Sequence, residues 1–120
     1  MKKPFKVEIS KEILQNIYSK VQNYQWHEMP DDGGWDYGTN LDYMKEFADY
    51  WVNKFDWRKT EEKINRFNNF KTNIHGIDIH FIHEKGSGSN PKPLLISHGW
   101  PGSIVEFLHI IDQLAHPEKF

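Results

Sequence analysis

The residues best suited to chemistry lie in one short segment, His98-Gly-Trp-Pro-Gly-Ser103. Two glycines and a proline, placed between an apolar run and a helical pattern, predict a tight turn with open backbone N–H groups at a helix start. Such N–H groups can stabilise a developing oxyanion, and losing one donor raises the barrier by roughly 3 to 4 kcal/mol. On spacing alone, a plain tight turn is the alternative interpretation.

Other residues that could do chemistry are weaker candidates. His75, His80 and His83 do not have the spacing of metal ligands, because residues three apart on a strand point to opposite faces. The segment around Ser103 lacks the G-x-S-x-G pattern of a hydrolase nucleophile, and Ser103 is predicted to cap a helix. The pair Asp31-Asp32 is typical of a turn rather than of catalytic acids. The sequence therefore predicts no metal and no other cofactor.

The composition limits the class of protein. The chain has 120 residues, and 15 Lys and Arg against 17 Asp and Glu give a net charge of −2, which argues against nucleic-acid binding. With no cysteine, it has neither disulfides nor thiolate sites. It lacks a signal-like segment and any apolar run near the ~20 residues of a membrane span, so we expect a soluble, cytoplasmic protein. Large enzyme folds commonly need about 200 to 250 residues, so one can be present only in part.

The elements before residue 69 are predicted to be helices and loops. Apolar residues at helical spacing predict three helices, over residues 10–22, 41–55 and 60–66. Ser10 is a plausible cap of the first helix, and Thr39 or Asn40 of the second. The aromatic stripe Phe47–Phe55 is predicted to be core rather than a cofactor site. The charges of the third helix are predicted to form a solvated face.

After residue 69 the pattern changes to that of strands. Alternating apolar residues predict two strands, over residues 70–74 and 77–81, joined by a turn at His75-Gly76. The apolar run Leu94-Leu-Ile96 predicts a buried sheet strand. Ser103-Ile-Val-Glu106 has the form of a capping box, and the helix that it starts is predicted to continue to Ala115. The unit is a strand, a turn and a capped helix.

Taken together, these motifs resemble the N-terminal part of the microsomal-type epoxide hydrolases, members of the α/β-hydrolase superfamily. In the family's order they are Trp35-Asp-Tyr-Gly38, Tyr50-Trp51, Phe55-Asp-Trp-Arg58, Phe70-Lys-Thr72, Gly76-Ile-Asp-Ile-His-Phe-Ile-His83 and His98-Gly-Trp-Pro-Gly-Ser103. A lone H-G-x-P is shared with other relatives, but the ordered series is specific. The fold class implied is a partial α/β fold. A helical meander over 1–69 precedes the first strands, the H-G-x-P turn and the first helix of an α/β-hydrolase core over 70–120.

The resemblance implies an enzyme that opens epoxides to diols through an aspartyl ester. In the family, an aspartate attacks the epoxide while two lid tyrosines donate to the opening oxygen, and water activated by a histidine and an acid then hydrolyses the ester. Trp100 would give one backbone N–H to the oxyanion hole. His98, Gly99 and Pro101 would shape the turn, with a cis peptide before the proline. The nucleophile, the tyrosines and the histidine lie downstream in relatives, so we expect this chain alone to be inactive.

The partners implied are a small-molecule epoxide, in the full-length enzyme, and the remainder of the hydrolase core and lid. Two alternatives stay open. One is a non-catalytic binding module or decayed gene product, whose open sheet edge and apolar face would invite association. The other is a related α/β-hydrolase such as a haloalkane dehalogenase, against which the N-terminal meander argues.

Overall fold

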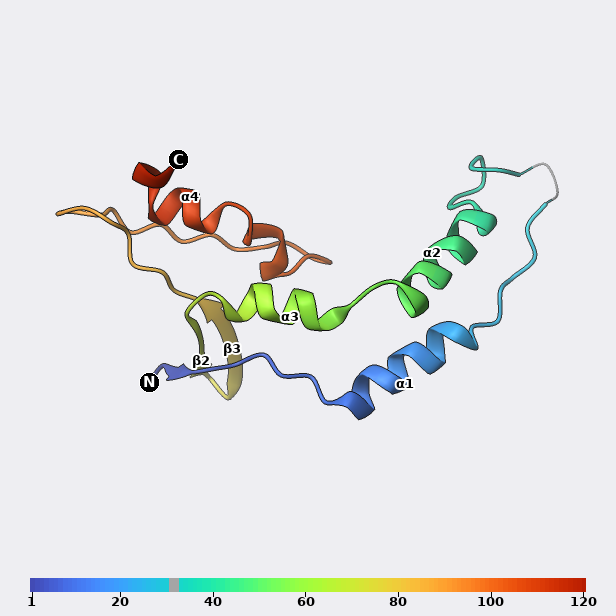
Figure 1. Cartoon of the computed structure of the whole chain (residues 1–120), viewed down its shortest axis with the longest axis horizontal. Coiled ribbons are helices and arrows are strands. Elements are labelled where there is room, and N and C mark those ends of the chain that lie inside the picture. Colours follow the sequence, from blue (N-terminus) through green and yellow to red (C-terminus); the bar gives the residue numbers. More distant parts are fainter. Residues whose placement is uncertain (31–32) are drawn as a thin grey trace. The chain divides into compact units, whose positions relative to one another are not determined.

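The computed structural model describes residues 1–30 and 33–120, and Figure 1 shows the elements along the chain. Contacts divide the chain into two compact units, Met1–Glu8 with Arg58–Phe120 and Ile9–Trp57. This division differs from the boundary after residue 69, which stays a prediction about the longer fold. The predicted turn at residues 31 and 32 lies outside the described residues. No helix of the described part has the length and apolarity of a membrane span.

The unit Ile9–Trp57 contains two helices that pack on each other, α1 (Lys11–Gln22) and α2 (Leu41–Asn53). The Ser10 hydroxyl accepts a hydrogen bond from a first-turn N–H of α1 at 3.2 Å. The side-chain oxygen of Asn40 does the same for α2 at 3.0 Å. These bonds satisfy N–H groups that have no partner within a helix. Both predicted helices and their caps are confirmed, although α2 ends at Asn53 instead of residue 55.

The aromatic stripe of α2 was predicted to be core, and that prediction is wrong for the described residues. No residue of α2 is buried, and the Phe47 side chain is 45% exposed. Phe47 and Trp51 contact each other edge to face, with ring centroids 6.2 Å apart. A helix buries its apolar stripe only where another element lies over it. In this unit, α1 and the segment after it cover α2 only in part.

The third helix, α3, spans Trp57–Asn65 and begins earlier than the predicted residue 60. Most of its charges are exposed, as predicted, but one is buried. Glu61 is only 8% exposed, because it lies one turn before the buried Ile64 on the same helix face. Arg58 Nη1 donates to Glu61 Oε2 at 2.6 Å. A buried carboxylate is costly without such a charged partner.

A three-stranded antiparallel sheet has the order β1 (Lys3–Pro4), β2 (Asn69–Ile74) and β3 (Ile77–Ile82). The hairpin between β2 and β3 turns at His75 and Gly76, with φ values of 51° and 85°. Two successive residues with positive φ are the pattern of a type I′ turn, whose twist matches that of the strands. The two predicted strands and their turn are confirmed.

The buried side chain of Asn69 joins α3 to this hairpin. Its Nδ2 donates to the carbonyls of Ile64 and Phe67, both at 2.8 Å, and its Oδ1 lies 2.9 Å from His80 Nε2. Because both amide hydrogens are used on carbonyls, the amide oxygen has to accept, so His80 carries a proton on Nε2. The His80 ring also meets the Phe5 ring edge-on, with centroids 5.0 Å apart.

The run Leu94–Ile96 was predicted to be a buried strand, and it is neither a strand nor buried. The Leu95 side chain is 93% exposed. A buried strand needs a neighbouring strand to satisfy its backbone N–H and C=O groups. No strand among the described residues pairs with this run.

The predicted helix from residue 103 to 115 is interrupted. It consists of a 3₁₀ turn, η1 (Ile104–Phe107), and a short helix, α4 (Ile111–Ala115), followed by a second 3₁₀ turn, η2 (Pro117–Lys119). Helical periodicity specifies a continuous helix only where packing holds its apolar face. Here Ala115 in α4 is buried, whereas Val105 in η1 is 41% exposed. Packing therefore supports regular helix only near its C-terminal end.

The position of His80 predicts a pH-dependent stability. Burial, and then the charge of Lys71, lower its pKa below the ordinary 6.5. The unfolded chain therefore binds this proton more readily, so the stability from neutral His80 is complete above pH 6.5 and is lost as pH falls through the folded-state pKa. We expect His80→Gln, which keeps a donor for Asn69, to unfold with a shallower pH dependence below 6.5. The measurement is urea denaturation followed by Trp fluorescence.

The matched control for this test is His75→Asn, because this histidine lies in the exposed hairpin turn and Asn tolerates positive φ. We expect the control to keep the slope of the wild-type chain. Equal slopes for the wild-type chain and His80→Gln would contradict the assignment.

Candidate functional site

Residues His98–Ser103 form a tight turn that leads into η1. The Gly102 N–H donates to the Gly99 carbonyl at 2.7 Å, and the Trp100–Pro101 peptide bond between them is cis. The four residues therefore form a β-turn with a cis proline at its third position. The cis peptide agrees with what the resemblance implied.

The Gly99 carbonyl accepts a second hydrogen bond inside this turn. His98 Nδ1 lies 3.2 Å from it, and since a carbonyl only accepts, the imidazole has to donate. The structure thus brings His98 and Gly102 to one backbone oxygen, that of Gly99, and Pro101 lies within the turn between the two glycines. His98, Gly99 and Pro101 lie at the surface of the described chain.

Trp100 occupies the tip of the turn and is 96% exposed. Its backbone N–H makes no hydrogen bond to any residue that the structure describes. The polypeptide on either side of this N–H is held by the bond between Gly99 and Gly102. Chemically, the turn can offer one fixed N–H donor to an anion or a polarised carbonyl.

Ser103 works as the helix cap that its spacing predicts. Its hydroxyl oxygen accepts from the Val105 N–H at 3.3 Å, and Glu106 Oε1 accepts from the Ser103 N–H at 3.2 Å. These reciprocal bonds form a capping box, so this prediction is confirmed. The hydroxyl has no neighbouring base among these contacts, and its geometry is that of a cap.

A contact that the sequence does not reveal joins the capping box to the turn. A side chain at Gly102 would overlap the Glu106 carboxylate and would lie 2.9 Å from the Gly99 carbonyl oxygen. The carboxylate ends a flexible side chain and can move aside, but the Gly99 carbonyl oxygen belongs to the backbone of the turn, so a side chain at Gly102 would crowd the turn itself. By contrast, a side chain at Gly99 would meet open space. The signal in the sequence was a glycine directly before the cap, in the spacing Gly-Ser-x-x-Glu.

The three histidines considered as metal ligands have different surroundings. His75 is in the hairpin turn, His80 is bonded to Asn69 and His83 lies against the Phe70 ring at a centroid distance of 6.4 Å. Within residues 1–30 and 33–120, no three His, Cys, Asp or Glu side chains are grouped so that they could hold a metal ion.

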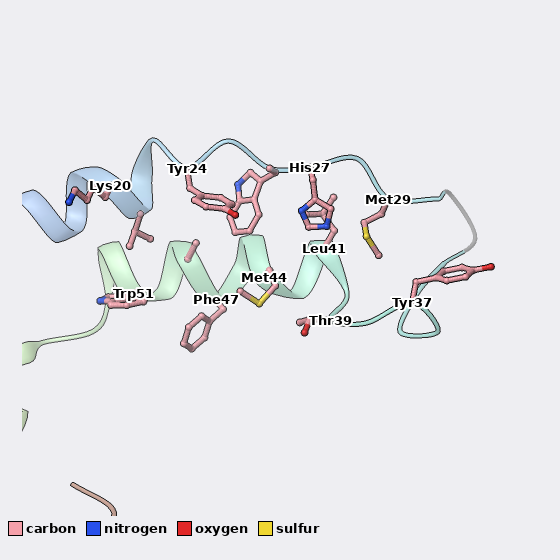
Figure 2. Close-up of a pocket in the computed structure, with 13 residues that line it drawn as sticks. Lys20, Tyr24, His27, Met29, Tyr37, Thr39, Leu41, Met44, Phe47 and Trp51 are labelled. Atoms are coloured by element: carbon pink, nitrogen blue, oxygen red, sulfur yellow. The ribbon is translucent and has the colours of Figure 1, made fainter. Parts of the chain in front are cut away.

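An apolar groove of about 640 Å³ runs along α2 in the unit Ile9–Trp57. Figure 2 shows the Tyr24 side chain between α2 and the segment that follows α1, and Phe47 on the opposite side of the helix. Its lining is mostly apolar and aromatic, and it also includes Lys20 and His27. The sequence did not reveal this groove, because an aromatic stripe at helical spacing has the same pattern in a closed core and in an open groove. The lining suits binding of apolar groups rather than acid–base chemistry.

Known proteins similar to this chain are epoxide hydrolases. The family described as "Epoxide hydrolase N terminus" matches residues 2–107. "Epoxide hydrolase 1" of Sus scrofa is 43% identical over 98% of this chain, which covers 27% of that protein. The structure of Aspergillus niger epoxide hydrolase matches all of this chain with a TM-score of 0.87 at 29% identity, over 31% of its own length. Juvenile hormone epoxide hydrolase from the silkworm Bombyx mori matches 95% of the chain with a TM-score of 0.85 at 30% identity, over 28% of its length.

Each of these relatives is matched over only part of its own length. The chain spans between about a quarter and a third of the length of these relatives, 27%, 31% and 28%. The turn His98–Ser103 lies inside the matched residues 2–107.

The close contacts at Gly102 predict that Gly102→Ala destabilises the turn more than Gly99→Ala does. We expect Gly102→Ala to destabilise the turn by about 1 kcal/mol or more, because the new methyl group would lie 2.9 Å from the Gly99 carbonyl oxygen and would also displace the Glu106 carboxylate. The measurement is hydrogen exchange of the Glu106 N–H, which donates to the Ser103 carbonyl at 3.1 Å. It should accelerate by at least several-fold. Gly99→Ala is the matched control and should leave this exchange nearly unchanged, and equal effects would contradict the assignment.

Proposed function

The chain belongs to the epoxide hydrolase family, and we propose that it serves as the N-terminal part of an enzyme that opens epoxides to diols. The structural matches make it part of an α/β-hydrolase fold. The observation that carries the proposal is the family match over residues 2–107, which includes the turn at His98–Ser103.

In the proposed reaction, an aspartate carboxylate of the longer enzyme attacks an epoxide carbon. The ring C–O bond breaks while two lid tyrosines donate hydrogen bonds to its oxygen, which takes a proton from one of them. Water, deprotonated by a histidine paired with an acid, then adds to the ester carbonyl. As the tetrahedral intermediate collapses, the histidine returns this proton to the leaving alkoxide and the diol departs. The carboxylic acid loses its proton to solvent, and the tyrosinate regains one from solvent. We assign none of these groups to residues 1–120, so the chain alone is not expected to catalyse the reaction.

The proposed role of this chain in the second step belongs to the backbone of Trp100. Its N–H donates to the oxyanion that forms when water adds to the ester. Support comes from the exposed position of Trp100 and from the bond between Gly102 and Gly99 that fixes the turn. A donor fixed in advance needs no reorganisation when the charge develops, and this is why such donors lower the barrier. His98, Gly99 and Pro101 shape the turn.

The proposed partner of this chain is the remainder of the hydrolase core and lid. Leu94 and Leu95 are 67% and 93% exposed, although they lie in an apolar run of the kind found in buried strands. Apolar surface of this kind is stabilised when another part of a protein covers it. A small-molecule epoxide would bind in the completed enzyme.

A hybrid enzyme tests the proposed function. Residues 1–120 would replace the matched region of the Sus scrofa enzyme, and diol formation from styrene oxide would be measured. We expect the hybrid to form diol and the isolated chain to form none, because the attacking carboxylate lies outside it. Chloride release from 1-chlorobutane, a dehalogenase reaction, should not occur. A folded hybrid without diol formation, beside an active parent enzyme, would contradict the proposal.

A backbone substitution tests the role of Trp100. Replacing this residue by its α-hydroxy analogue turns the amide into an ester and removes the N–H while keeping the indole. In the hybrid we expect ester hydrolysis to slow by roughly 10²- to 10³-fold, the loss typical of one oxyanion donor. The covalent intermediate should accumulate and be visible by mass spectrometry. Trp100→Phe keeps the N–H and is the control, and unchanged hydrolysis in the α-hydroxy variant would refute the assignment.

A further inference from the structure

We propose that Glu106 is a positioning residue for the Trp100 N–H, acting through the turn and not by touching substrate. This inference rests on the proposed function, because it concerns the donor that the turn presents. Glu106 lies in η1, outside the H-G-x-P residues themselves.

Two contacts connect the Glu106 carboxylate to the turn. Its Oε1 accepts from the Ser103 N–H at 3.2 Å. The same carboxylate packs against Gly102 so closely that it occupies the place where a side chain would be. Gly102 in turn donates to the Gly99 carbonyl at 2.7 Å, and Trp100 lies between these two glycines. The path from Glu106 to the donor is therefore one packed contact and one hydrogen bond.

The second contact exceeds what a helix cap requires. A capping box needs only the bond from the Glu106 carboxylate to the Ser103 N–H. The nearest atoms to the free side-chain position of Gly102 are those of Glu106 and the Gly99 carbonyl oxygen. Without the carboxylate, the polypeptide at Gly102 can move into the space that it leaves. Such movement would turn the Trp100 N–H away from a fixed acceptor position.

The effect of Glu106 is one of shape and hydrogen bonding rather than of charge. A negative charge close to an oxyanion would oppose its formation. A glutamine has the same length and offers an amide oxygen to the Ser103 N–H, so it can take the same place. An aspartate keeps the charge but is one methylene shorter, and it cannot reach both groups in the same way.

The test compares Glu106→Ala, Glu106→Gln and Glu106→Asp in the hybrid enzyme with styrene oxide. We expect kcat to fall about tenfold for Ala and Asp, less than for loss of the whole donor. The ratio kcat/KM should stay unchanged, because it reports the earlier attack on the epoxide. The covalent intermediate should accumulate in both variants. Glu106→Gln should keep the kcat of the unsubstituted hybrid.

Asp112→Ala is the matched control, since it also removes a carboxylate, one that accepts from Arg66 Nη2 at 2.8 Å. It should lower the melting temperature without changing the balance between the two steps. A parallel loss of kcat and kcat/KM in Glu106→Ala and Glu106→Asp would show a merely structural role and overturn the inference. So would a Gln variant as slow as the Ala variant.

Failure of this inference differs from failure of the proposed function. If the α-hydroxy variant at Trp100 is slow in ester hydrolysis and the Ala and Asp variants are not, the proposed function stands and only the role of Glu106 is wrong. If the α-hydroxy variant hydrolyses the ester normally, the role of Trp100 is wrong, and the inference about Glu106 falls with it.

Discussion

The buried amide of Asn69 is the interaction on which the unit that carries the turn depends. Two carbonyls near the end of α3 and the ring of His80 on β3 all bond to this one side chain, at 2.8 to 2.9 Å. The Ile64 carbonyl also accepts from the Phe67 N–H at 3.2 Å, so the bond from Asn69 is its second, at the point where the chain leaves the helix. Because Asn69 is also the first residue of β2, the end of α3 and the start of the sheet are fixed by the same group. Ile64 and Phe67, which bury their side chains beside it, complete this centre.

Contacts between residues that are close in the sequence were predictable. Contacts between residues that are far apart in the sequence were not. Ser10 and Asn40 cap helices whose first turns lie next to them, and His75-Gly76 turns a hairpin whose strands flank it. Sequence spacing reports such contacts directly. The strand predicted at Leu94–Ile96 depends on a neighbouring strand, which its own pattern cannot supply. The buried Glu61 likewise depends on which face of α3 is covered.

The same distinction applies to the candidate site. The turn at His98–Ser103 and the capping box were visible in the sequence, because glycine, proline and the S-x-x-E spacing have local meanings. The two hydrogen bonds to the Gly99 carbonyl were not visible, since either glycine of the turn could have had that role. The sequence also could not show how the two glycines differ. In the folded structure a side chain at Gly102 would meet Glu106 and the Gly99 carbonyl oxygen, whereas a side chain at Gly99 would meet open space.

A donor that belongs to the backbone changes which side chains matter to a reaction. In the proposed role, no substitution except one by proline would remove the Trp100 N–H, so selection would act on this donor mainly through the groups that hold the polypeptide. In this chain those groups are a carbonyl that accepts twice, a glycine with no room for a side chain and a carboxylate packed against it. Each contact is modest, of the order of 1 kcal/mol for a neutral hydrogen bond. Together these contacts fix the direction in which the Trp100 N–H points. That direction matters for electrostatic stabilisation, because a donor is effective when it already points to where the charge will form.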